Sequence, residues 1–140
     1  MSLKMDAAAL NGFLAREFEQ VAADFTVESA SEDLLVMRLK VNDAHLRPGG
    51  TVSGPSMFGL VDLAIYCAIL SKIGPVGLSV TTNASIDFMR KPESGRDLLA
   101  QCRLLKLGRV LAVGDALIYS DGQGEPVARS SMTYSIPPKR

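Results

Sequence analysis

The most constraining feature of this sequence is a run of fourteen residues, Met57 to Leu70, that is apolar apart from one glycine and one carboxylate, Asp62. Ser53 stands where a helix N-cap would, and Gly74 can end a helix. These residues predict a helix from about Pro55 to Lys72. Because this helix is apolar nearly all round, we expect other elements to cover it on most sides.

The composition is that of one ordinary globular domain spanning residues 1–140. The chain is 47% hydrophobic and 21% charged, and it has 15 acidic residues against 15 Lys and Arg. A zero formal net charge gives no electrostatic reason to expect a nucleic acid or an anionic membrane as a partner. The N-terminus has no apolar stretch long enough for a signal peptide, and Cys67 and Cys102 read as buried free thiols. We therefore expect a cytoplasmic protein with no nucleic-acid or membrane partner.

The remaining sequence predicts one further helix and a set of strands. Apolar residues recur at helical spacing between Asp6 and Val21, which predicts an amphipathic helix on one flank. A period of two predicts strands at about 25–30, 34–41, 80–88, 97–107, 110–119 and 126–137. In the strand 80–88, the alternation assigns one face to Val80, Thr82, Ala84, Ile86 and Phe88. No helix-length gap separates the last four strands, so we expect an α+β fold in which an antiparallel sheet curls around the central helix.

Asp62 needs a partner or a function, because an ionised carboxylate buried alone costs several kcal/mol. The residues one helical turn away are not basic, so no salt bridge within the helix satisfies it. One interpretation gives it an Arg, a Lys or a strand hydroxyl as a partner, from the sheet or from a second subunit. The other gives it a catalytic or ligand-binding role.

The start of the central helix is the second candidate feature. A helix N-terminus presents unsatisfied N–H groups, and Gly54 is the natural donor because Pro55 has no N–H. Gly54 and Asp62 are eight residues apart, which separates their backbones by about 12 Å along the helix. One helix is therefore unlikely to bring both groups to one carbonyl. Two helices packed antiparallel across a twofold axis would set Gly54 of one chain opposite Asp62 of the other, and so form two equivalent sites per dimer.

Other constellations are weaker. Ser53, His45 and Asp62 are the residue types of a hydrolase triad, but the sequence around Ser53 lacks the G-x-S-x-G spacing of a nucleophile elbow. His45 is the single histidine and the two cysteines are scattered, so we expect no metal site. The basic residues at strand ends and turns either face solvent or meet phosphates; they are Arg90, Lys91, Lys106 and Arg109.

Two segments together resemble a known family. HLRPGGTVSGPSMFGLVDLA (45–64) and VTTNASIDFMRKP (80–92) resemble the hotdog-fold acyl-CoA thioesterases of the phenylacetate-degradation type, within the 4-hydroxybenzoyl-CoA thioesterase superfamily. The resemblance implies the hotdog fold and hydrolysis of an acyl- or aryl-acyl-CoA to the free acid and CoA. It also implies no cofactor beyond the coenzyme A of the substrate, and a homodimer or a dimer of dimers with its site between subunits.

The same resemblance assigns roles to individual positions. Asp62 matches the catalytic nucleophile or general base, Gly54 matches the glycine whose N–H polarises the thioester carbonyl, and Thr81 matches a Ser or Thr near the attacking water. The sequence departs from the family motif at three positions, with Ser53 in place of His, Pro55 in place of Gly and Arg47 in place of Asn. The residues expected to contact the substrate are Arg47, Ser53, Pro55, Asn83, Arg90, Lys91 and Arg109.

Three functions follow from these observations. The leading one is hydrolysis of an acyl-CoA, with Asp62 of one subunit and Gly54 of its partner at each site. The second is a non-catalytic module that binds an acyl-CoA or another small ligand, which the loss of the motif His and the presence of Arg47 favour. In the third, Asp62 is a hydrogen-bond acceptor at a dimer interface and binds no ligand.

Overall fold

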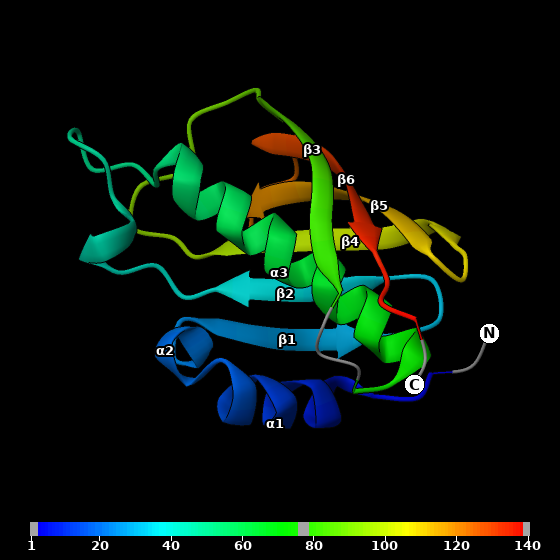
Figure 1. The fold of residues 1–140 in the computed structure, drawn as a ribbon. Coiled ribbons are helices and arrows are strands. Elements are labelled where there is room, and N and C mark those ends of the chain that lie inside the picture. Colours follow the sequence, from blue (N-terminus) through cyan, green and yellow to red (C-terminus); the bar gives the residue numbers. More distant parts are fainter. Residues whose placement is uncertain (1–2, 76–78, 139–140) are drawn as a thin grey trace.

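In a computed structural model that describes residues 3–75 and 79–138, a six-stranded sheet wraps around one long helix (Figure 1). Every strand pairing is antiparallel, and the strand order is β1-β2-β4-β5-β6-β3. The strands are β1 (Phe25–Ala30), β2 (Leu35–Leu39), β3 (Val80–Phe88), β4 (Leu98–Leu107), β5 (Leu111–Ser120) and β6 (Ala128–Ser135). The predicted α+β class and the antiparallel sheet are therefore confirmed.

The long helix α3 (Gly54–Ile73) lies in the curve of the sheet, as its apolar composition predicts. Ser53 caps its start, with Oγ accepting a hydrogen bond from Ser56 N at 3.3 Å. Gly74 ends it with a φ of 92° and donates its N–H to Leu70 O at 2.8 Å. The predicted boundaries are correct to within one residue. The length and composition of α3 would also suffice to cross a membrane, but most of the helix is buried inside this fold.

Two helices, α1 (Ala7–Glu17) and α2 (Glu19–Ala22), replace the single N-terminal helix predicted for 6–21. The prediction is wrong at Phe18, where φ is −132° and ψ is 46°, so the helix breaks. The break goes together with a contact to the central helix, since the Phe18 ring packs edge-on against Tyr66 with 5.7 Å between ring centroids. The buried face of α1 is the predicted one, formed by Leu10, Phe13 and Leu14.

Strand β3 lies at one edge of the sheet and, among the described strands, pairs with β6 alone. The strand is as predicted, and its predicted alternation is correct after the bulge but wrong before it. Ala84, Ile86 and Phe88 pair with residues on the buried face of β6, and Phe88 packs on Gly54 of α3. Val80 of the same predicted face is 57% exposed, whereas Thr81 turns toward α3. The physical reason is a bulge between Thr81 and Asn83, which brings Thr81 onto the same face as Ile86 and Phe88. Most of β3 is exposed, including Val80 and Phe88.

Candidate functional site

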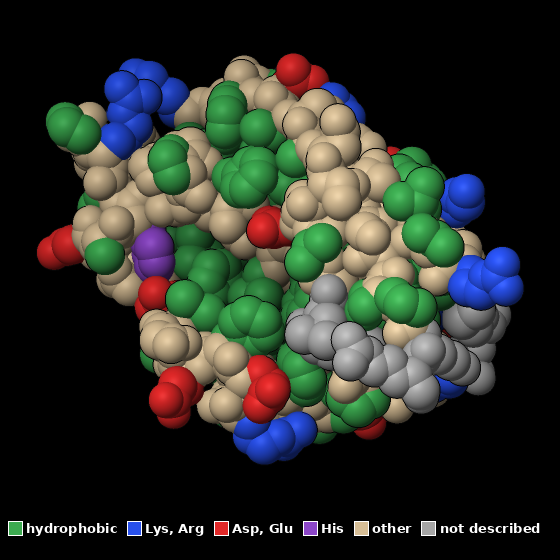
Figure 2. All heavy atoms as spheres, viewed as in Figure 1, with side chains coloured by type: hydrophobic (Ala, Val, Ile, Leu, Met, Phe, Trp, Pro, Cys, Tyr) green, Lys and Arg blue, Asp and Glu red, His purple; other side chains and the backbone are tan. Residues whose placement is uncertain are grey.

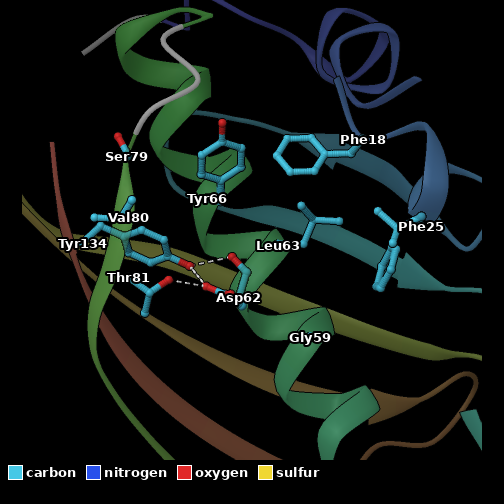
Figure 3. A pocket seen from close by; sticks show the side chains of 11 residues that line it. Phe18, Phe25, Gly59, Asp62, Leu63, Tyr66, Ser79, Val80, Thr81 and Tyr134 are labelled. Carbon is cyan, nitrogen blue, oxygen red and sulfur yellow. Dashed lines mark hydrogen bonds between the residues drawn. The ribbon is translucent and has the colours of Figure 1, made fainter. Parts of the chain in front are cut away.

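The carboxylate of Asp62 accepts hydrogen bonds from two hydroxyl groups, which belong to the adjacent strands β3 and β6 at one edge of the sheet (Figure 3). Thr81 Oγ1 on β3 donates to Asp62 Oδ1 at 2.6 Å. Tyr134 OH on β6 contacts the same Oδ1, and it also lies 2.6 Å from the main-chain O of Asp62. The two strands pair directly, with Thr81 opposite Tyr134. The strand-hydroxyl partner expected for this carboxylate is thus present within one chain.

The Asp62 carboxylate also lines a groove of about 460 Å³ whose other walls are mainly apolar. Figure 2 shows hydrophobic side chains gathered in a hollow on the face where α3 is visible in Figure 1. The groove lies between α3, the start of β3 and the N-terminal elements, and its lining includes Phe18, Val21, Phe25, Leu63, Tyr66 and Val80. A charged oxygen at the wall of an apolar groove is a typical arrangement for chemistry on a bound apolar group.

Tyr66 and Ser79 add two buried hydroxyls to the lining of this groove. Neither hydroxyl has a hydrogen-bond partner among the described residues. Burial raises the pKa of Tyr66 to about 12, and the pKa of Tyr134 is also raised, by burial and then by its hydrogen bond to Asp62. Both phenols are therefore protonated near neutral pH. Among the described residues that line this groove, Asp62 is the one carboxylate and none is Lys or Arg.

Gly54 lines a different groove, of about 410 Å³, at the N-terminal end of α3. Within the described part of the chain, no group accepts a hydrogen bond from Gly54 N, as expected for the first residue of a helix. Gly54 and Asp62 of one chain therefore line different grooves, as expected from their spacing along the helix. The side-chain position of Gly54 is not open space, because a Cβ there would lie 3.2 Å from Phe88 Cζ. The glycine thus serves a packing role as well.

Basic side chains surround the second groove. Arg47, Arg90 and Lys91 all line it and are exposed. Arg90 is already engaged, since its Nε lies 2.9 Å from a Glu125 carboxylate oxygen and its guanidinium donates to Pro126 O at 2.7 Å. The structure therefore brings three of the predicted substrate-binding residues together beside Gly54, with Arg47 and Lys91 available for an anionic ligand.

Four other predicted substrate-binding residues line neither groove. The Ser53 hydroxyl is occupied in capping α3, and Pro55 is exposed in its first turn. Asn83 is exposed on β3 just after the bulge. Arg109 lies in the hairpin between β4 and β5, which Figure 1 places at the end of the sheet away from the start of α3.

The triad of Ser53, His45 and Asp62 is not formed. His45 accepts a hydrogen bond from Asn42 N at 3.0 Å, and its Nε2 lies 3.3 Å from Asp24 Oδ2. Asp62 binds strand hydroxyls instead. Within residues 3–75 and 79–138, no group of three or more His, Cys, Asp or Glu side chains is placed to hold a metal ion.

Sequence reasoning missed Tyr134, which has the closest contact with Asp62. A signal was present, because Tyr134 continues the inward face of β6 with Ala128, Ser130 and Met132. A phenol on an inward face needs a hydrogen-bond partner, and the acid on the central helix was the evident unsatisfied group. Phe18 and Tyr66 were among the aromatic residues expected to set the depth of a pocket, and both line this groove, whereas Phe25 was missed.

The comparisons with known proteins agree with this geometry. The thioesterase superfamily profile matches residues 49–127. Acyl-coenzyme A thioesterase 13 of Homo sapiens is 30% identical over 123 residues, which cover 87% of this chain and 86% of the human protein. A crystal structure from Silicibacter sp. TM1040, provisionally assigned as a thioesterase, is 57% identical and has a TM-score of 0.93, covering 99% of this chain and 96% of its own.

A more distant structure shares the fold alone. A hypothetical thioesterase of Streptococcus pneumoniae TIGR4, crystallised with coenzyme A, has a TM-score of 0.75 at 21% identity, covering 90% of this chain and 98% of its own.

The fold, the family profile and the human relative all lead to one assignment. The chain belongs to the thioesterase superfamily, and it is a thioester hydrolase with the hotdog fold.

Proposed function

We propose that this protein hydrolyses acyl-CoA thioesters to the free acid and coenzyme A. The observation that carries the proposal is the position of Asp62, whose carboxylate is fixed by two hydroxyls at the wall of a groove of about 460 Å³ with apolar lining. An apolar acyl group fits such a groove, and the Asp62 carboxylate is placed to contact the thioester of a bound acyl-CoA. The human relative is named for the same reaction.

We further propose that each site forms between two copies of the chain. The Asp62 groove includes Thr81 at the start of β3, whereas the Gly54 groove includes Phe88 at its end. Antiparallel pairing of two β3 edges across a twofold axis would therefore lay the Asp62 groove of one chain against the Gly54 groove of the other. The exposed edge and its apolar residues support this pairing, because such edges are normally covered.

In the reaction, the acyl carbon gains a bond to oxygen and loses its bond to sulfur. Asp62 Oδ2 supplies the electron pair in one of two ways. It attacks the carbonyl carbon to form an acyl-aspartate anhydride, which water then hydrolyses to the free acid, or it takes a proton from the water that attacks. The N–H of Gly54 from the partner chain donates to the carbonyl oxygen as negative charge develops there. The CoA thiolate leaves and takes up a proton. Asp62 is suited to this role because Oδ2 accepts no hydrogen bond from the described residues.

The groove beside Gly54 supplies a site for the charged end of the substrate. Coenzyme A carries phosphate groups, and Arg47 and Lys91 are exposed cations at this groove. Composite sites would therefore place the acyl group on one chain and the nucleotide end near the cations of its partner. Arg47 stands where the family motif has Asn, so it gives this chain a charge that the motif lacks.

Release of CoA tests the proposal. A panel of acyl-CoAs is incubated with the protein while a thiol reagent reports free CoA; Cys67 and Cys102 are both buried, so the folded protein contributes little signal. Asp62→Asn should lower kcat at least about 100-fold. Asp115→Asn is the matched control, since Asp115 lies on β5 outside both grooves. No hydrolysis of any acyl-CoA, or equal rates for Asp62→Asn and the wild type, would refute the proposal.

A further inference from the structure

The phenol of Tyr134 makes contact with two oxygens of a single residue. Its OH lies 2.6 Å from the main-chain O of Asp62 and is also bonded to Oδ1 of the same side chain. Tyr134 is 1% exposed, and its ring extends from β6 toward Asp62 on α3 (Figure 3). One fixed hydroxyl therefore links the Asp62 side chain to its own backbone, which restricts the carboxylate to one orientation.

This hydroxyl acts as a hydrogen-bond donor to the carboxylate. Burial and the neighbouring Asp62 charge raise the pKa of Tyr134 above its ordinary value, so the phenol keeps its proton across the working pH range. Thr81 Oγ1 donates to the same Oδ1 at 2.6 Å. Oδ1 thus receives two donors, whereas Oδ2 receives none from residues 3–75 and 79–138. The two carboxylate oxygens are made chemically different.

We infer that Tyr134 is a positioning residue, which holds the Asp62 carboxylate with Oδ2 as its reactive oxygen. The effect of Tyr134 on rate rests on the proposed function, whereas its effect on the orientation of Asp62 rests on geometry alone. A carboxylate that is already fixed loses no orientational freedom when the substrate binds.

The other titratable groups around Asp62 do not compete with this effect. Apart from Asp62 and Tyr134, the one titratable side chain among the described lining residues is Tyr66 of α3, and its pKa of about 12 keeps it neutral. On the sheet side, the Cys102 thiol of β4 donates a hydrogen bond to Ala64 O. Burial raises the pKa of this thiol, so it is also neutral. The N-terminal segment contributes Phe18 from the break between α1 and α2, Val21 of α2 and Phe25 of β1, none of which titrates.

Tyr134→Phe tests the inference, because it removes the hydroxyl and keeps the buried ring. We expect kcat to fall about 10-fold with little change in KM, because the carboxylate loses the donor that orients it but the groove keeps its shape. Tyr119→Phe is the matched control: Tyr119 lies on β5 and lines neither groove, so kcat and KM should stay as in the wild type.

A measurement without turnover separates this inference from the proposed function. Carbon-13 NMR of labelled aspartate observes the Asp62 carboxylate directly, with Asp62→Asn identifying its signal. The chemical shift of this carboxylate at a fixed pH should change in Tyr134→Phe, because a hydrogen-bond donor is lost, and should stay as in the wild type in Tyr119→Phe. If the wild type hydrolyses no thioester, this readout still decides whether Tyr134 holds Asp62. If the wild type is active and Tyr134→Phe leaves both kcat and the chemical shift unchanged, the inference is wrong and the proposed function stands.

A second substitution covers the case in which Tyr134→Phe does not fold. Incorporation of 3-fluorotyrosine at position 134 keeps the shape and the hydroxyl but makes the phenol a stronger donor. The chemical shift of the Asp62 carboxylate should then differ from that of the wild type at the same pH, because the strength of its donor has changed. A merely structural tyrosine would leave this chemical shift unchanged, and that result would overturn the inference.

Discussion

The ring of Phe88 packs over Gly54, so that a Cβ on Gly54 would lie 3.2 Å from Phe88 Cζ. The first residue of α3 and the last residue of β3 are thereby in contact. This contact joins the helix terminus, which offers the N–H of Gly54, to the sheet edge proposed as the dimer contact. Gly54 therefore has two separable properties: it lacks a side chain and it has an N–H group.

Substitutions at Gly54 separate these two properties. Gly54→Ala adds a Cβ and keeps the N–H; because Phe88 is 52% exposed and can shift, we expect only a moderate loss of kcat. Gly54→Pro also adds a Cβ but removes the N–H, and Ser53 already has the extended backbone that precedes proline. We expect kcat to fall by a further factor of about 100, as for loss of an oxyanion donor. Equal kcat for the two variants would exclude the N–H from catalysis.

Thr81 should affect rate through its hydroxyl. Thr81→Val keeps the branched shape but cannot donate to Asp62 Oδ1, and we expect kcat to fall about 10-fold as one of two donors is lost. Thr81→Ser keeps the donor and should retain most of the activity. Steady-state kinetics on the two variants decide the matter. The role is refuted if Thr81→Ser loses as much activity as Thr81→Val.

The basic groove should affect substrate binding more than the chemical step. The double variant Arg47→Gln with Lys91→Gln should raise KM for an acyl-CoA about 10-fold and change kcat little, because both cations lie beside Gly54 and are exposed. KM for the corresponding acyl-pantetheine thioester, which lacks the nucleotide, should not change. Arg103→Gln on β4 is the control, since Arg103 lines neither groove beside α3. Equal effects on both substrates would place the nucleotide elsewhere.

Stability should decline at high pH. Burial raises the pKa of Cys67 to about 12, whereas an exposed cysteine has a pKa of about 8.5. Between these values the folded state binds more protons than the unfolded state, so the free energy of unfolding falls as pH rises. Below about pH 8 this thiol contributes no pH dependence. Urea denaturation in reductant from pH 7 to pH 10.5 measures the slope, and Cys67→Ala should make it shallower. An equal slope in that variant would contradict the buried neutral thiol.

Much of the fold could be predicted because its signals are local. The apolar run around Asp62 and the cap at Ser53 give α3 to within a residue, and a period of two gives every strand. The separation of Gly54 from Asp62 also follows from helical rise alone. Each of these features depends on residues that are near one another in sequence.

The features that sequence could not give depend on contacts between distant elements. The break at Phe18 accompanies its packing on Tyr66, and the bulge after Thr81 turns this threonine toward Asp62. Tyr134 is 72 residues from Asp62 along the chain, and β6 must pair with the edge strand β3 to bring the two together. A pattern within one segment contains no information on such pairings.

Subunit complementation tests most directly whether Asp62 of one chain and Gly54 of its partner form one site. Asp62→Asn and Gly54→Pro chains with different affinity tags are co-expressed, and oligomers that contain both are purified. In a mixed dimer, one site combines both substitutions and the other has neither, so we predict about half of the wild-type activity although each variant alone is nearly inactive. Mixed oligomers as inactive as the parent variants would show that Asp62 and Gly54 do not act together across a subunit boundary.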